Sequence, residues 1–121
     1  HVEVVSSILN LDIKTQGAAI RYSSLYGSAG ANVNFVEQIN DASFSIRTYE
    51  RGVEDETLSC GTGATAVAIA MNYIGKTNLN TIKINVQGGK LEVSFDKKDS
   101  HYSNVFLKGP ATFVFQGKIN I

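Results

Sequence analysis

The feature that most constrains the fold is the segment at residues 60–75, which is rich in alanine and apolar on nearly every side. Two glycines lie just after its first residue, Cys60, and Gly75 stands at its end, where glycine commonly terminates a helix. A helix that is apolar all round is buried, because it has no polar face to present to water. The segment therefore predicts a central helix with other elements packed around it.

The apolar residues outside this helix follow the alternation that is typical of strands. Strands are predicted at residues 2–5, 33–39, 44–49, 82–86, 91–95, 104–107 and 112–115, and a shorter helix at residues 11–22. Asn40-Asp41 and Gly88-Gly89 are turn sequences that would close two hairpins. We therefore expect an α/β (α+β) fold, in which a curved, mixed or antiparallel sheet wraps around one central helix.

Length and charge limit the classes of partner. The 121 residues, 43% of them hydrophobic, suit a single domain that spans residues 1–121. Eleven basic residues balance eleven acidic ones, so the chain lacks the basic footprint of a nucleic-acid or membrane-surface binder. No apolar run has the roughly 20 residues that a membrane helix needs. We expect a small-molecule partner and, because a single cysteine cannot form an internal disulfide, a cytoplasmic location.

The segment just before the central helix gathers residues with chemical potential. Cys60 stands at the predicted helix start, where unpaired backbone N–H groups and the helix dipole favour a thiolate. Gly61 and Thr62 leave room for a carboxylate to approach the amides of the first turn. Glu50 and Arg51 end the preceding strand, and they could bind the ammonium and carboxylate groups of an amino acid from opposite faces.

Each of these features has a more ordinary interpretation when it is taken alone. A lone cysteine is most often an inert buried residue, and Gly-x-Gly is most often a tight turn. Glu50-Arg51 could be a solvated charge pair, and we expect the acidic run Glu54-Asp55-Glu56 to be exposed. The functional interpretation is favoured because thiol, glycines, helix start and charged pair occur within one short segment.

The same residues carry a resemblance to a known family. Four motifs match in order along almost the whole chain: Gly-Ala-Asn-Val-Asn-Phe at residues 30–35, Glu-Arg-Gly with Glu-Thr and Cys-Gly-Thr-Gly-Ala at residues 50–64, Gly-Gly-Lys-Leu at residues 88–91, and Gly-Pro-Ala at residues 109–111. This pattern resembles that of the diaminopimelate epimerases. Cys-Gly-Thr-Gly alone would not separate them from the related proline racemases, but the Glu-Arg-Gly and Asn-Val-Asn motifs do favour the diaminopimelate epimerases.

The resemblance implies two similar domains with the substrate held between them, of which this chain is the carboxy-terminal one. It implies no metal and no cofactor: one cysteine thiolate removes the α-proton while a thiol of the other domain protonates the opposite face. The missing amino-terminal domain is then a required partner, and the chain alone is expected to be inactive. We also expect the cleft face, once exposed, to allow self-association into a homo-oligomer.

Residue roles follow from the matched motifs. Cys60 corresponds to the acid/base of this domain, and the amides of Gly61 and Thr62 to the group that holds the carboxylate at the reacting carbon. The resemblance implies that Asn32, Glu50 and Arg51 contact the substrate, with Glu50 also near the thiol. It also implies that His1 supports the cysteine of the other domain, whereas His101 matches no functional position and is expected in a solvated loop.

One departure and two alternatives remain. The matched pattern usually has one residue fewer between Glu-Arg-Gly and the cysteine, so residues 53–55 contain an insertion, which we expect to alter a surface loop more than the helix start. One alternative keeps the chemistry but changes the substrate to proline or hydroxyproline, which offers Arg51 no distal carboxylate. The other is a non-catalytic module that captures an anion at the helix start.

Overall fold

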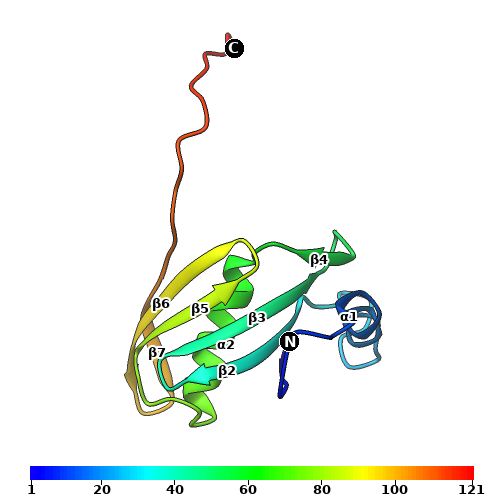
Figure 1. Cartoon of the computed structure of the whole chain (residues 1–121), viewed down its shortest axis with the longest axis vertical. Coiled ribbons are helices and arrows are strands. Elements are labelled where there is room, and N and C mark those ends of the chain that lie inside the picture. The colour runs from blue at the N-terminus through cyan, green and yellow to red at the C-terminus, as the bar shows by residue number, and fades with distance from the viewer.

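The fold is a single mixed sheet with one helix lying against its concave side, in a computed structural model that describes residues 1–121 (Figure 1). The elements are β1 (Val2–Val4), α1 (Ile13–Arg21), β2 (Val33–Asn40), β3 (Ser43–Glu50), β4 (Asp55–Thr57), α2 (Gly61–Tyr73), β5 (Thr81–Val86), β6 (Gly89–Lys98) and β7 (His101–Lys108). The strand order is β1-β2-β3-β5-β6-β7, with β4 paired to the end of β3. The predicted mixed sheet around a central helix is confirmed.

Helix α2 is the centre of the main core. It contacts strands from both ends of the sheet, β1 and β2 on one side and β6 and β7 on the other, so the sheet curves around it. Its buried residues Ala64, Val67, Ala68 and Met71 pack among apolar side chains of the strands. The strand residues of this core are Val36, Phe44, Ile46, Ile82, Ile84, Val93 and Phe95.

The two ends of α2 are fixed by its local sequence. Cys60 is the N-cap, and its sulfur accepts a hydrogen bond from the amide of Gly63. At the other end Gly75 adopts a φ of 77°, which glycine tolerates best, and the amide of Lys76 donates to the carbonyl of Met71. Together with the bond from the Gly75 amide to Asn72, this forms a Schellman motif. The predicted start and stop are therefore both confirmed.

Helix α1 covers the opposite face of β2 and β3. It begins at the N-cap Asp12, whose carboxylate accepts from the amide of Thr15 at 3.1 Å. Ile13 packs with Val33, Phe35 and Tyr49 in a second, smaller core. Because Val33 and Phe35 face α1 while Asn34 and Val36 face α2, β2 is buried on both sides over its first half.

Both predicted hairpins form. In β2–β3, Val36 lies opposite Ile46, and in β5–β6, Ile82 lies opposite Val93, so each pair directs its apolar residues toward α2. A parallel contact between β3 and β5 joins the two hairpins into one sheet. The last hairpin, β6–β7, places His101 opposite Lys98 at the first position of β7. His101 is exposed as expected, but it belongs to a strand rather than a loop.

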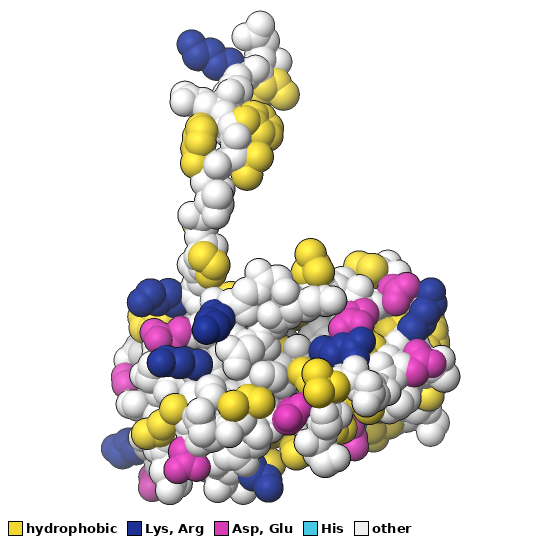
Figure 2. Space-filling model, viewed as in Figure 1, with side chains coloured by type: hydrophobic (Ala, Val, Ile, Leu, Met, Phe, Trp, Pro, Cys, Tyr) yellow, Lys and Arg dark blue, Asp and Glu magenta, His cyan; other side chains and the backbone are white.

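The strand predicted at residues 112–115 is wrong. After Lys108 the chain leaves the sheet, and residues 109–121 extend away from the domain with no hydrogen-bonded neighbour (Figure 1). Apolar alternation gives only a tendency to extend, and a stable strand also needs a partner edge. The tail consequently leaves large apolar side chains exposed (Figure 2). They are Phe113, Val114, Phe115, Ile119 and Ile121.

A close approach between α2 and β2 fixes the start of the central helix. A Cβ on Gly63 would overlap the side-chain oxygen of Asn34 and lie 3.2 Å from the sulfur of Cys60. Asn34 cannot readily move, because it is 2% exposed, accepts from the hydroxyl of Thr48 at 2.8 Å and donates to the carbonyl of His1 at 3.0 Å. The absent side chain at Gly63 therefore allows the helix start, with Cys60, to sit directly on the sheet.

Replacing Gly63 by alanine should lower the free energy of unfolding by about 1–3 kcal/mol, the usual cost of inserting an atom into packed structure. This loss would occur although alanine is a better helix former than glycine by about 1 kcal/mol. Ala66→Gly, at an exposed position of the same helix, isolates that propensity. Chemical unfolding measures both variants, and a stabilised Gly63→Ala protein would contradict the close packing.

Candidate active site

Cys60 lies at the N-terminal end of α2, the helix at the centre of the main core. Its sulfur is 3.4 Å from the amide nitrogen of Gly63 and 3.4 Å from the hydroxyl of Thr62, and the residue is 7% exposed. The amides of Gly61 and Thr62, in the first turn, have no carbonyl within the helix to bind. No acidic residue occupies this turn. The helix start therefore favours an anionic ligand group just outside it.

The helix start forms part of an open cavity of about 540 Å³. Its lining consists of Glu50, Ser59, Cys60, Gly61, Thr62, Thr65 and Leu107. Four of the predicted site residues therefore line one cavity: Glu50, Cys60, Gly61 and Thr62. The carboxylate of Glu50 is held by the hydroxyl of Thr57, which donates to it at 2.8 Å. A larger hollow of about 680 Å³, lined by Lys83, Lys90 and Lys108 among others, contains no predicted site residue.

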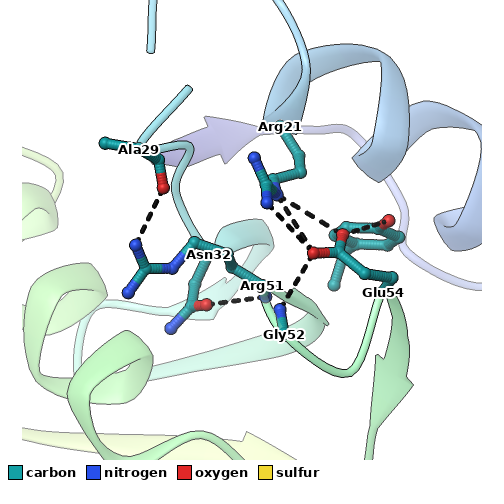
Figure 3. A network of polar contacts seen from close by, with 7 residues as sticks. Arg21, Ala29, Asn32, Arg51, Gly52 and Glu54 are labelled. Atoms are coloured by element: carbon teal, nitrogen blue, oxygen red, sulfur yellow. Dashed lines mark hydrogen bonds and ion pairs between the residues drawn. The ribbon is translucent and has the colours of Figure 1, made fainter. Parts of the chain in front are cut away.

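Asn32 links the cysteine to the turn that follows β3. Its side-chain nitrogen lies 3.7 Å from the sulfur of Cys60 and donates to it, while its side-chain oxygen accepts from the amide of Arg51 at 2.8 Å (Figure 3). One amide group therefore donates to the sulfur and at the same time fixes the backbone of Arg51. Asn32 therefore lies between the sulfur of Cys60 and the backbone of Arg51.

The side chains of Arg51 and His1 do not line the cavity. Arg51 is exposed, and its guanidinium donates to the carbonyl of Ala29 at 2.8 Å (Figure 3). The imidazole of His1 lies 2.6 Å from the hydroxyl of Tyr26 and 3.0 Å from the carboxylate of Glu3. Glu50, the last residue of β3, lines the cavity, whereas Arg51, which begins the turn, does not.

The acidic run after Arg51 is paired rather than freely solvated, which corrects the expectation from the sequence. Each carboxylate has a cationic partner: Arg21 for Glu54 at 3.1 Å, Lys14 for Asp55 at 3.0 Å, and Arg47 for Glu56 at 2.7 Å. Asp55 keeps 48% of its side chain exposed, but Glu54 keeps 32% and Glu56 only 20%. These ion pairs therefore hold the turn against α1 and β3.

Two ionisable groups in this turn are shifted in opposite directions. The pKa of Glu54 is lowered to about 2, first by the amide of Gly52, which donates to it, and then by the guanidinium of Arg21. The pKa of Tyr49 is raised to about 12 by burial and by its hydrogen bond to Glu54, at 2.8 Å. Both shifts favour an ionised Glu54 that accepts from a neutral tyrosine.

Several residues of the site were not predicted. Thr57 orients Glu50, Thr65 and Leu107 line the cavity, and Arg21 binds Glu54. Thr57 lies within the matched motif, so it could have been proposed from the sequence. Neither Leu107 nor Arg21 gave a local signal, because Leu107 reaches the cavity, and Arg21 the turn that carries Glu54, from a distant part of the chain.

No group of three or more His, Cys, Asp and Glu side chains is arranged to hold a metal ion. Neither helix has the length and apolar character needed to cross a membrane.

Solved structures of other proteins share the fold of this chain. A hydroxyproline epimerase from Agrobacterium vitis, with bound trans-4-hydroxy-L-proline, matches with a TM-score of 0.60 at 16% identity, over 81% of this chain and 30% of its own. A phenazine biosynthesis protein of the PhzF family from Enterococcus faecalis matches with a TM-score of 0.59 at 22% identity, over 84% and 34%. At these identities the likeness establishes the fold, one that epimerases and PhzF proteins share.

Sequence comparison defines the family within this class. Residues 1–114 match the family model described as diaminopimelate epimerase, and the chain belongs to that family. The diaminopimelate epimerase of Flavobacterium psychrophilum is 66% identical over 98% of this chain and 46% of its own length. That of Chlorobaculum tepidum is 38% identical over 99% and 46%. The chain thus spans less than half the length of these relatives.

The lowered pKa of Glu54 predicts a pH-dependent contribution to stability. Because ionisation is favoured in the folded chain, this contribution is complete above the ordinary value of 4.5 and is lost as the pH falls toward about 2. Glu54→Gln should therefore destabilise the chain at neutral pH, with a difference from the unmodified chain that shrinks in acid.

Urea unfolding at about pH 6 and about pH 3 measures how the difference in stability between the two proteins changes with pH. The stability depends on pH because Glu54 takes up a proton when the chain unfolds in acid. Asp41→Asn is the matched control, because Asp41 is exposed and has no ionic partner. An equal destabilisation by Glu54→Gln at both pH values would contradict the ionised, hydrogen-bonded state of Glu54.

Proposed function

We propose that the chain supplies one half of the active site of a diaminopimelate epimerase, which interconverts LL- and meso-diaminopimelate in lysine biosynthesis without a cofactor. Membership of the family supports this activity. The observation that carries it is the position of the Cys60 sulfur, beside the free first-turn amides of Gly61 and Thr62 at the wall of one cavity. A base and a carboxylate-binding site are thereby adjacent.

The chemistry requires both groups. In the proposed reaction the thiolate of Cys60 removes the α-proton of the amino acid, and the electron pair left on the α-carbon is delocalised into the adjacent carboxylate. The amides of Gly61 and Thr62 bind that carboxylate and stabilise the growing negative charge on its oxygens. A thiol on the opposite face then delivers a proton to the carbon, which inverts its configuration, and the roles exchange in the reverse direction.

The remaining predicted residues have supporting roles in this proposal. Asn32 donates to the Cys60 sulfur and also contacts the distal amino-acid end of the substrate together with Arg51. Arg51 suits a distal carboxylate, because its planar fork can bind two oxygens at once. Glu50 lines the cavity near the thiol, where it can accept from the substrate ammonium group. His1 is proposed to support the cysteine of the other half.

The second thiol must come from a part of the enzyme outside this chain. Cys60 is the sole cysteine here, and the relatives are about twice as long. We propose that an amino-terminal domain covers the open cavity, and that the exposed apolar side chains of residues 109–121 pack against it. Without that domain the same surfaces favour self-association. A cytoplasmic location fits a mechanism that needs reduced thiols.

Removing the thiol should nearly abolish turnover. In the full-length enzyme we expect Cys60→Ala to reduce the rate of epimerisation by on the order of 10²–10⁴-fold, the usual contribution of a positioned acid/base. Cys60→Ser is the matched control, because its hydroxyl oxygen can still cap the helix although the thiol is gone. Circular dichroism checks the fold of both variants, and retained activity in Cys60→Ala would remove Cys60 from the mechanism.

The isolated chain should not invert its substrate. We expect no net conversion of LL- to meso-diaminopimelate in D₂O, because only one face of the α-carbon meets a thiol. Adding the separately produced amino-terminal half should restore conversion and deuterium incorporation. Full turnover by the chain alone would contradict the half-site, and turnover of proline or hydroxyproline instead would favour the related racemases as its class.

A further inference from the structure

The ion pair between Arg21 and Glu54 joins the end of α1 to the turn that follows β3. The Nε of Arg21 lies 3.3 Å from each carboxylate oxygen of Glu54, and a terminal nitrogen lies 3.1 Å from one of them (Figure 3). The Arg21 side chain is only 13% exposed and also stacks over the ring of Tyr22, at 4.4 Å. This pair is therefore more enclosed than the Lys14–Asp55 pair, whose side chains are 69% and 48% exposed.

The carboxylate of Glu54 holds the turn together through hydrogen bonds to neighbouring residues. Its carboxylate accepts from the amide of Gly52 at 3.0 Å and from the hydroxyl of Tyr49 at 2.8 Å, in addition to Arg21 (Figure 3). Glu54 itself has a φ of 59°, an uncommon conformation for a residue with a side chain, and Gly52 has a φ of 94°. The turn at residues 51–54 thus depends on one carboxylate that binds across it.

Arg21 also contacts the loop that precedes β2. Gly30 has a φ of 64°, and a Cβ at this position would overlap the guanidinium of Arg21. The arginine therefore lies between two segments: residues 29–32 on one side and residues 51–54 on the other. The first carries Asn32 and the second carries Arg51, and these two segments also bind each other through the hydrogen bonds of Arg51 to Asn32 and Ala29.

We propose that the Arg21–Glu54 pair is a positioning device for the substrate site, which holds Asn32 and Arg51 at the separation needed to bind the distal end of the substrate. This inference rests on the proposed function. Neither Arg21 nor Glu54 lines the cavity at Cys60, so both act through the two loops. They are positioning residues rather than catalytic ones.

Loss of the Arg21–Glu54 pair should raise KM for the substrate more than it lowers kcat. Of the contacts that hold Cys60 and the first turn of α2, only the long bond from Asn32, at 3.7 Å, comes from the two loops. The bond from the Gly63 amide and the packing of Gly63 on Asn34 do not involve them. Loss of the pair leaves those contacts in place and frees the loops that bind the far end of the substrate. An interaction equally strong in the ground and transition states changes KM while kcat stays constant.

The test uses the full-length enzyme with Arg21→Met, which removes the guanidinium and keeps a long side chain. We expect KM for diaminopimelate to rise on the order of tenfold, with kcat changed by no more than about twofold. Arg21→Lys keeps the charge and should recover part of the loss, and Glu54→Gln should reproduce the rise in KM. Lys14→Met is the matched control, because it makes the same kind of change on the same helix and breaks only the exposed pair with Asp55.

Amide hydrogen exchange gives a second reading that needs no substrate. Arg21→Met should speed exchange at residues 29–32 and 51–54 but not at residues 61–64, whereas Lys14→Met should leave all three unchanged. Unchanged exchange in the loops, an equal rise in KM from Lys14→Met, or a fall in kcat at constant KM would each overturn the proposal. If the unmodified enzyme lacks epimerase activity, the proposed function fails, and exchange alone still decides whether the pair holds the two loops.

Discussion

The contact between Gly63 and Asn34 is the constraint on which the rest of the site depends. Because Gly63 lacks a side chain, the first turn of α2 can lie directly on β2, and this places Cys60 at the wall of the cavity. The same contact orients the Gly63 amide toward the sulfur. A buried helix that is apolar on all sides can rotate or slide without losing hydrophobic area, so such a specific polar contact is needed to fix where it starts.

Charge pairing has a comparable role around the turn after β3. Three carboxylates in succession would repel one another in an exposed loop, but each is bound to a cation from a different position: α1 supplies two and β3 the third. The guanidinium of Arg47, which binds Glu56, also donates to the carbonyls of Ile8 and Leu11. These bonds hold the segment before α1 against β3. The turn is thereby ordered without a hydrophobic core of its own.

The parts of the fold that sequence reasoning predicted are those with local signals. Alternation identified both hairpins, and the alanine-rich run with Gly75 identified α2, because helix and strand periods are read within a few turns or residues. The meeting of Cys60, Gly61 and Thr62 followed from the helix start alone. Only the family resemblance places Glu50 near the thiol; in the structure β4 pairs with the end of β3, and Glu50 lines the cavity beside the helix start.

The parts that were missed depend on distant partners. Arg21 meets Glu54 across 33 residues of sequence, and no local pattern announces such a pair. The acidic run was expected to be solvated because its cations lie elsewhere in the chain. Alternation at residues 112–115 predicts a strand, yet in the structure this segment pairs with neither edge strand of the sheet, β1 or β7. Propensity describes a segment, whereas pairing depends on what the rest of the protein provides.

The most direct measurement is a crystal structure of the full-length enzyme with diaminopimelate bound. The account predicts the α-carbon at about 3–3.5 Å from the sulfur of Cys60, the separation of reacting atoms, with the adjacent carboxylate on the amides of Gly61 and Thr62. The distal end should lie against Asn32 and Arg51. A substrate bound away from the start of α2, or with its carboxylate held elsewhere, would contradict the account.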